Sequence, residues 1–334
     1  MRRKLLALRV AVALLVAVRP GLADNAPGPT VEVAPGLFAV VWPEDGGNVA
    51  FLVTEEGVLV VDTGASAEQA GTILARIREK TDRPIRYILL THYHDDHTNG
   101  LASFPFGATV VAHHDLAANL AKSTAADLEA YPAHIARREK LVRDLAKEGG
   151  EKLKQAQDRL AASRRAYEAL KAARPVVPTI TFASTLTIRL GKEIIELHHL
   201  GPTHTTCSSV VYFPRQKAVH MGDQVFAGAH PYIDGRAGAD TERWVASLKA
   251  AEAWGVDRVI PGHGPVRGRE ELTTQIGYLE DLRQEVRAAI SRDLSAADAR
   301  KSVTMEAYKG YRWADLVPNS VEVVHQELTA QRPK

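Results

Sequence analysis

The stretch Thr91-His92-Tyr93-His94-Asp95-Asp96-His97 follows directly on the apolar run 85–90 and is the most informative part of the chain. The run predicts a buried strand, because a strand covered on both faces is almost continuously hydrophobic. In α/β folds, ligands bind at the carboxyl ends of such strands. Imidazole and carboxylate groups without a thiolate favour zinc, and they also suit iron or manganese. The candidate metal ligands within these seven residues are His92, His94, Asp96 and His97.

Three later segments extend this candidate site. Gly201-Pro202-Thr203-His204-Thr205 and Gly262-His263-Gly264 each follow or end a predicted strand, and Gly222-Asp223 supplies a further carboxylate. In an extended turn, His92 and His94 can point one way while Asp96 and His97 reach a second position, so two metal ions can lie side by side. A chance histidine-rich loop would not account for the later segments. The sequence therefore predicts a metal site with seven candidate ligands.

Several motifs together resemble the metallo-β-lactamase superfamily: the H-x-H-x-D-H pattern, Val60-Val61-Asp62-Thr63-Gly64, His204, Gly222-Asp223 and Pro261-Gly262-His263-Gly264. The resemblance covers about residues 31–267 apart from a helical insert. It implies an α/β fold, a four-layer αββα sandwich with the site at one edge. It also implies one zinc ion held by His92, His94 and His204, a second held by Asp96, His97 and His263, and Asp223 bridging both.

One feature departs from the β-lactamases best known for hydrolysing antibiotics. Their second zinc commonly has a cysteine or an additional histidine ligand, whereas Asp223 resembles the bridging aspartate of glyoxalase II and lactonases. Cys207 lies in the wrong segment to replace Asp223, and we expect it to be a small buried residue. Asp62 ends a buried strand and needs hydrogen-bond partners, so we expect it to fix a ligand or the ligand loop.

The predicted function is that of a zinc-dependent hydrolase acting on a small-molecule substrate. Two zinc ions lower the pKa of a bridging water to near 7, and the resulting hydroxide would cleave an ester, thioester, lactone or amide bond, including a β-lactam. We expect Asp96 to be catalytic as well as a metal ligand, by orienting the hydroxide or moving its proton. Residues 226–238 either line the cleft or pack as a surface loop. The alternative function is an exported, metal-bearing accessory protein of a periplasmic quinoprotein or sulfur-oxidation system, which rests on resemblance alone.

Residues 1–23 have the pattern of a secretory signal peptide, which predicts a periplasmic or secreted protein. Their apolar run is too short for a membrane span and is interrupted by Arg9, so no stable span is expected after cleavage. Five basic residues and no acidic ones fall in this segment, which leaves 37 basic against 40 acidic residues. Charge therefore gives no support for a nucleic-acid partner. The single cysteine, Cys207, excludes an intrachain disulfide.

The rest of the chain, residues 24–334, is predicted to form one catalytic domain with two helical additions. Heptad-like spacings on either side of Gly149-Gly150 predict an inserted helical hairpin over about 115–174, and Pro132 predicts that its first helix begins or kinks there. A helical extension is expected over about 270–334. The hairpin is expected to act as a lid or as the surface of a homodimer, and a solvated appendage is the alternative.

Overall fold

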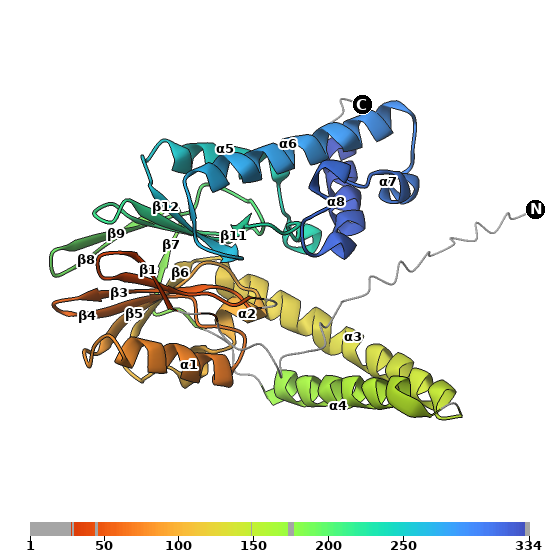
Figure 1. Cartoon of the computed structure of the whole chain (residues 1–334), viewed down its shortest axis with the longest axis horizontal. Coiled ribbons are helices and arrows are strands. Elements are labelled where there is room, and N and C mark those ends of the chain that lie inside the picture. The colour runs from red at the N-terminus through yellow and green to blue at the C-terminus, as the bar shows by residue number, and fades with distance from the viewer. Residues whose placement is uncertain (1–27, 29, 44–45, 148, 173–176, 331–334) are drawn as a thin grey trace, which may run out of the picture. The chain divides into compact units, whose positions relative to one another are not determined.

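The computed structural model describes residues 28, 30–43, 46–147, 149–172 and 177–330 of the chain. The predicted signal peptide, residues 1–23, lies outside these ranges. Two sheets form the centre of the structure (Figure 1). The first has seven strands in sequence order: β1 (Thr30–Ala34), β2 (Leu37–Val40), β3 (Val49–Thr54), β4 (Gly57–Val61), β5 (Ile85–Leu90), β6 (Thr109–His113) and β7 (Ile180–Phe182).

The first sheet changes from antiparallel to parallel pairing along its width. Strands β1 to β4 are connected as an antiparallel meander, whereas β4, β5, β6 and β7 pair in parallel. Parallel neighbours need a crossover connection, and helix α1 (Ala67–Arg78) supplies the one between β4 and β5. Ser66 begins this helix by accepting a hydrogen bond from the backbone N–H of Gln69. The carboxyl ends of β4 and β5 therefore lie at the same edge of the sheet.

The second sheet has six strands in the order β13-β12-β11-β10-β9-β8. Strands β8 to β11 pair antiparallel. Strand β11 pairs in parallel with β12, and the helix α5 (Thr241–Glu252) lies in the connection between these two strands. The strands of this sheet are β8 (Thr185–Leu190), β9 (Glu193–His198), β10 (Val210–Phe213), β11 (Ala218–Phe226), β12 (Arg258–His263) and β13 (Arg267–Gly268). The parallel pair again places two strand ends, those of β11 and β12, at one edge.

Three buried clusters show how the layers pack. One lies between the sheets and combines residues such as Leu59 and Leu89 with Leu197 and Phe213. A second packs α1 against the outer face of the first sheet, and a third packs α5 and α6 (Glu270–Ser291) against the second sheet. Figure 1 shows these helices on the outer faces of the two sheets. The predicted α/β fold with two sheets between outer helices is confirmed.

Two long helices occupy the region of the predicted insert. Helix α3 covers Leu116–Leu145 and α4 covers Gly150–Ala172, and residues 130–172 form a compact unit of their own. Within that unit the rings of Tyr131 and Tyr167 stack with centroids 5.5 Å apart. Of the two alternatives for Pro132, a helix start is wrong, because α3 begins 16 residues earlier and contains the proline, and a kink stays a prediction. Its ordinary helix-forming neighbours outweigh the hydrogen bond that one proline removes.

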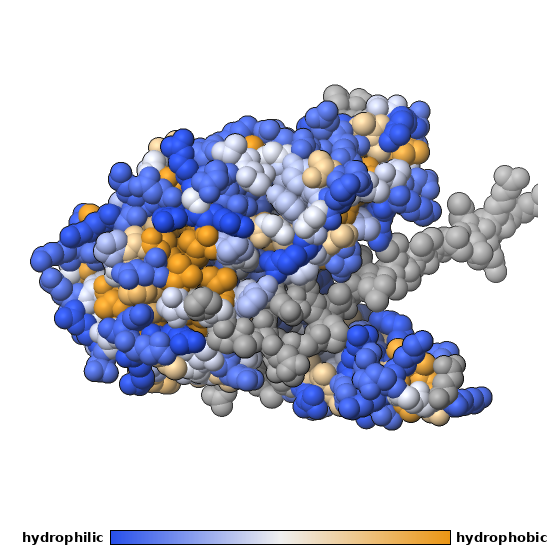
Figure 2. Space-filling view, in the orientation of Figure 1, coloured by the Kyte–Doolittle hydropathy of each residue, from blue (hydrophilic) through white to orange (hydrophobic). Residues whose placement is uncertain are grey.

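The chain after β13 is largely helical, with α6, α7 (Ala296–Ser302) and α8 (Val317–Ala330). Their apolar sides join α5 and the second sheet in one buried cluster. Among the described residues, no helix combines the length and the hydrophobicity that a membrane crossing requires. On the face drawn in Figure 2, hydrophilic surface predominates, and hydrophobic surface gathers over the strands of the two sheets.

Candidate metal centre

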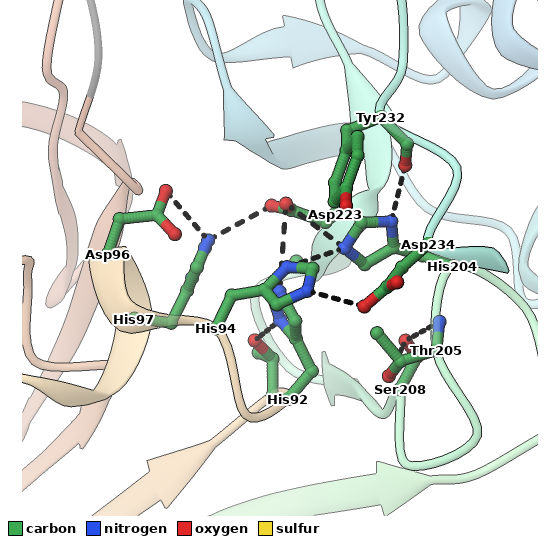
Figure 3. A network of polar contacts seen from close by, with 12 residues as sticks. His92, His94, Asp96, His97, His204, Thr205, Ser208, Asp223, Tyr232 and Asp234 are labelled. Carbon is green, nitrogen blue, oxygen red and sulfur yellow. Dashed lines mark hydrogen bonds and ion pairs between the residues drawn. The ribbon is translucent and has the colours of Figure 1, made fainter. Parts of the chain in front are cut away.

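The edge where the strand ends meet carries all seven candidate ligands, and Figure 3 labels all of them except His263. His92 and His94 lie in the loop after β5, and that loop continues into the short helix α2 (Asp95–Thr98), which holds Asp96 and His97. His204 comes from the loop between β9 and β10. Asp223 lies within β11, and His263 is the last residue of β12. Residues that are far apart in the sequence thus meet because four strand ends share one edge.

The candidate ligands form two groups around one carboxylate. In the first group, Oδ2 of Asp223 lies 3.6 Å from Nε2 of His92 and 3.4 Å from Nε2 of His204. The same nitrogen of His204 is 3.0 Å from Nδ1 of His94. Two imidazoles therefore face one oxygen of Asp223, and the third lies beside them. We call His92, His94 and His204 the first group.

The other oxygen of Asp223 faces a second set of side chains. Oδ1 lies 3.0 Å from Nε2 of His97 and 3.3 Å from Nε2 of His263. Oδ2 of Asp96 is 3.5 Å from the first of these nitrogens and 3.2 Å from the second. We call Asp96, His97 and His263 the second group. Asp223 presents one oxygen to each group.

The spacing and the unused bonding capacity of these atoms fit metal ions. Two atoms that each lie about 2.1 Å from a tetrahedral metal are about 3.4 Å apart, which is close to the separations in both groups. Three buried atoms that face this space, Nε2 of His92, Nε2 of His97 and Oδ1 of Asp223, have no hydrogen-bond partner among the described residues. Buried polar atoms normally have a partner. The His/Asp cluster therefore supports a metal cofactor.

The imidazoles of the first group are oriented by partners on their opposite ring nitrogens. Nδ1 of His204 lies 2.7 Å from the backbone oxygen of Tyr232, and Nδ1 of His92 lies 3.1 Å from Oγ1 of Thr91. Nε2 of His94 lies 3.1 Å from Oδ2 of Asp234. Metal-binding histidines usually make such a bond with the nitrogen that does not bind the metal, because it fixes the tautomer and the ring orientation.

Asp62 plays the same part for the second group, and its backbone is strained. Its Oδ2 lies 2.8 Å from Nδ1 of His97, and its two oxygens also accept bonds from the backbone N–H and hydroxyl of Thr91, each at 2.8 Å. Asp62 has a φ of 64°, a left-handed conformation that is uncommon outside glycine and is often found at functional sites. The prediction that Asp62 fixes the ligand loop is confirmed.

Asp234 is a site residue that the sequence did not single out. Its buried carboxylate accepts a hydrogen bond from the hydroxyl of Tyr93 as well as contacting His94, and its other oxygen accepts from the backbone N–H of Arg236. It belongs to the stretch 226–238, for which the sequence left two interpretations open. The structure places this stretch at the centre, where the ring of Tyr232 lies 5.7 Å from that of His94.

Two glycines allow the chain to approach the centre closely. A Cβ atom on Gly262 would lie 2.1 Å from Oδ1 of Asp223, and one on Gly47 would lie 2.7 Å from the ring of His97. Both distances are far below van der Waals contact. Between them, the side chain of Asn48 donates to the backbone oxygens of Pro261 and Gly264 at 2.9 and 2.8 Å. The loop before β3 is thereby joined to the end of β12.

Burial and neighbouring charges shift the pKa values of the candidate ligands in different directions. Burial lowers the pKa of His204 to about 4, and burial together with the neighbouring His97 lowers the pKa of His92. Burial also opposes charge on His263, but Asp223 and Asp96 raise its pKa to about 9. Burial disfavours ionised Asp96, yet the charges and bonds of His97 and His263 lower its pKa to about 2. Without a metal, His92 and His204 are held neutral, whereas the second group forms ion pairs.

Three of the seven side chains are reached by solvent. The side chains of His92, His97, His204 and Asp223 are at most 4% exposed. His263 is 7% exposed, His94 16% and Asp96 25%. A substrate can therefore approach only where Asp96, His94 and His263 meet solvent.

Cys207 has no place in either group. It is fully buried, its Sγ lies 3.5 Å from Oγ1 of Thr205, and burial raises the pKa of its thiol. A thiol with a raised pKa is a poor metal ligand, because the thiolate is the form that binds metal. The prediction that Cys207 is a small buried residue is confirmed.

Comparison with known proteins agrees with this architecture. The family model of the metallo-beta-lactamase superfamily matches residues 42–263. The linear primary-alkylsulfatase of Pseudomonas sp. (strain ATCC 19151) is 27% identical over 252 residues, which cover 68% of this chain and 43% of that protein. The chain thus spans less than half the length of this relative.

Solved structures show the same fold. The stereoselective inverting sec-alkylsulfatase from Pseudomonas sp. superposes with a TM-score of 0.65 at 16% identity, over 91% of this chain and 50% of the other. A metallo-β-lactamase from Pseudomonas aeruginosa, described in a mono-zinc form, superposes with a TM-score of 0.54 at 18% identity, over 77% and 96% of the two chains. The chain belongs to the metallo-β-lactamase superfamily. Membership in this family and the His/Asp cluster together support a metal-dependent hydrolase.

Proposed function

We propose that the protein is a dinuclear zinc hydrolase that cleaves an ester, thioester, lactone or amide bond of a small molecule. The observation that carries this proposal is the position of Asp223, whose two oxygens face two separate groups of side chains. A carboxylate placed in this way is suited to bridge two metal ions. In the proposal, His92, His94 and His204 hold one zinc ion, Asp96, His97 and His263 hold the other, and Asp223 contacts both.

Bound zinc would supply a water of lowered pKa and would polarise the bond to be cleaved. The protein's own part is to orient the imidazoles of the first group, to bury four of the seven side chains and to leave the other three accessible to solvent. Asp96 is the most exposed of the seven side chains, and the low pKa keeps its carboxylate ionised at neutral pH. We propose that Asp96 accepts a hydrogen bond from the attacking water and moves its proton towards the leaving group.

A second substrate class is a sulfate ester of an alkyl chain. Its support is the likeness to two proteins named as alkylsulfatases, one by sequence and one by fold. A β-lactam is supported by the likeness of fold to a metallo-β-lactamase. All of these bonds place a negatively charged or carbonyl oxygen beside the scissile bond, where a metal can bind it.

The proposal is tested by assaying the zinc-supplemented protein against matched β-lactam, lactone, thioester and alkyl sulfate substrates. We expect turnover of at least one class, its loss on treatment with a chelator and its return when zinc is added. Asp96→Asn, assayed with enough zinc to fill both positions, should lose at least about 100-fold in rate, because an amide cannot accept and release the proton. Protein that binds zinc but turns over no class would contradict hydrolysis and favour the accessory role.

We also propose that residues 1–23 direct export and that the hairpin pairs two copies of the chain. The first proposal rests on the basic and apolar pattern of that segment. The second rests on the length of α3 and α4, 30 and 23 residues, because long insertions in a compact domain are often functional. Mass spectrometry of the mature chain and the mass of the protein in solution test them separately.

A further inference from the structure

The C-terminal extension returns to the metal centre at Arg312 and Trp313. The backbone N–H of Arg312 donates to the oxygen of Gly228 at 3.1 Å, and its own backbone oxygen accepts from His230 at 2.9 Å. These bonds form an isolated bridge with Ala229, three residues after β11 ends. Since β11 carries Asp223, the extension is tied to the same strand that positions the shared carboxylate. This part of the extension lies beyond residues 42–263, which match the family model.

The indole ring of Trp313 contacts a candidate metal ligand directly. Its centroid lies 5.0 Å from that of His263 in an edge-on arrangement, and 6.1 Å from that of Phe226. The ring of Phe226 stacks nearly parallel to the same imidazole, with centroids 5.2 Å apart and planes 16° apart. Phe226 is only 2% exposed. Trp313 is only half-buried. It therefore combines contact with His263 and surface that solvent reaches.

The backbone holds Trp313 in a conformation that a non-glycine residue rarely adopts. Its φ and ψ are 63° and 40°, in the left-handed region. The backbone N–H of Leu316 donates to its oxygen at 2.9 Å, and the guanidinium of Arg312 lies 4.9 Å from the ring centroid. Arg312 also donates through Nη1 to the backbone oxygen of Pro43 at 2.7 Å. Strained residues that are held by several contacts are concentrated at functional sites.

The position of this ring matters because few of the candidate ligands are accessible. His263 is one of the three side chains that meet solvent, and Trp313 contacts its imidazole. A partly exposed indole at that place offers an apolar surface for offset or edge-on aromatic contact.

We propose that Trp313 is a specificity-determining residue that forms an apolar wall of the substrate site and selects molecules with an aromatic ring next to the metal-binding group. Arg312 is a positioning residue that keeps the indole in place. This inference rests on the proposed function, because it assumes that the substrate binds at the metals. It adds the class of substrate, an aromatic acid derivative, to the type of bond.

The test measures equilibrium binding of phenylacetate and acetate to the zinc-loaded full chain by calorimetry. Both probes carry a carboxylate for the metals, and only phenylacetate carries a ring. We expect the ratio of their affinities to fall about tenfold in Trp313→Ala and to stay within about threefold in Trp313→Phe, since aromatic contacts contribute up to about 1.5 kcal/mol beyond burial. Zinc content is measured in each variant.

Tyr311→Ala is the matched control. Tyr311 is a half-buried aromatic residue of the same extension, but its ring contacts are with His230, Tyr278 and Tyr308 and not with the centre. The substitution Tyr311→Ala should leave the ratio of the two affinities unchanged. If Trp313→Ala loses zinc, Trp313→Leu decides the matter, because it keeps apolar bulk and removes the ring.

An unchanged ratio in a Trp313 variant that retains zinc would overturn the inference, and so would equal affinities of the unmutated protein for the two probes. Binding needs no turnover, so the outcome is separate from that of the proposed function. If the affinity ratio falls in Trp313→Ala but the protein hydrolyses no substrate, the role of Trp313 in binding stands and only the proposed hydrolase function is contradicted.

Discussion

The two groups that face Asp223 differ in the hydrogen-bond partners of their side chains and in how exposed those side chains are. Each imidazole of the first group has a partner for its second nitrogen, and two of these partners are uncharged oxygens of Thr91 and Tyr232. In the second group, His97 is held by Asp62, but Nδ1 of His263 is buried without a hydrogen-bond partner among the described residues. Asp96, at 25% exposure, is the most accessible side chain of the centre.

This difference indicates how two similar sets of ligands take different roles. Three imidazoles with fixed orientation make a tight metal site, because little has to change when the metal binds. The second group must give up ion pairs between its histidines and carboxylates, and it contains Asp96, the most exposed of the seven side chains. We therefore expect the metal at the second group to be held more weakly and to be the one nearer the substrate.

Removing the residue that both groups share should have the largest effect. Asp223→Ala leaves two facing sets of imidazoles without their common carboxylate, so we expect loss of most bound zinc and a fall in hydrolysis of at least about 1,000-fold. Cys207→Ser is the control and should leave zinc content nearly unchanged. A large loss of zinc in the Cys207 variant would overturn the assignment of the ligands.

Truncating one histidine from each group should separate the two sites. His263→Ala is expected to lower the zinc content from about two ions per chain to about one, because the first group remains complete. His204→Ala should remove the tighter ion, which would be seen as weaker retention during dialysis. Equal retention in the two variants would contradict the difference between the groups.

A smaller effect is expected from the carboxylates that orient the ligands. Asp62→Asn should weaken zinc binding at the second group, and Asp234→Asn should weaken it at the first, each by about 10- to 100-fold. Asparagine tolerates the left-handed conformation of Asp62, so the change tests charge without added backbone strain. Competition with a chromophoric chelator measures both affinities. Variants that weaken the same ion would show that the partners do not act group by group.

The smallest effect on the metals is expected from the hairpin. Replacing residues 120–170 by a short Gly/Ser linker should leave zinc content unchanged, because no candidate ligand lies among the described residues of this range. We expect a change in KM or in the mass of the protein in solution. If both stay the same, the solvated appendage is the remaining interpretation.

The fold and the set of candidate ligands could be predicted because their signals are local. Each motif can be recognised from a few consecutive residues. This holds for the buried run of β5 with the histidine motif that follows it, and for the later segments around His204, Asp223 and His263. Asp62 could be anticipated for the same reason, since a carboxylate at the end of an apolar strand needs partners. Each of these inferences used the end of a strand as its landmark.

Asp234 and Trp313 could not be predicted in this way. Both lie in irregular segments, where neither hydrophobic period nor spacing gives a position relative to the centre. Asp234 meets His94 and Tyr93 only after the loop following β11 has folded back, and Trp313 meets His263 only after the extension has paired with Ala229. Their roles depend on long-range packing, which a single sequence does not reveal.

The most direct test of the central claim is elemental analysis of the mature protein during a graded chelator titration. The account predicts about two zinc ions per chain after zinc supplementation, then a plateau at about one, and finally loss of the last ion. In His263→Ala the titration should begin at that plateau. One ion or none in the supplemented protein, or release of both ions in a single step, would contradict a dinuclear centre with two unequal groups.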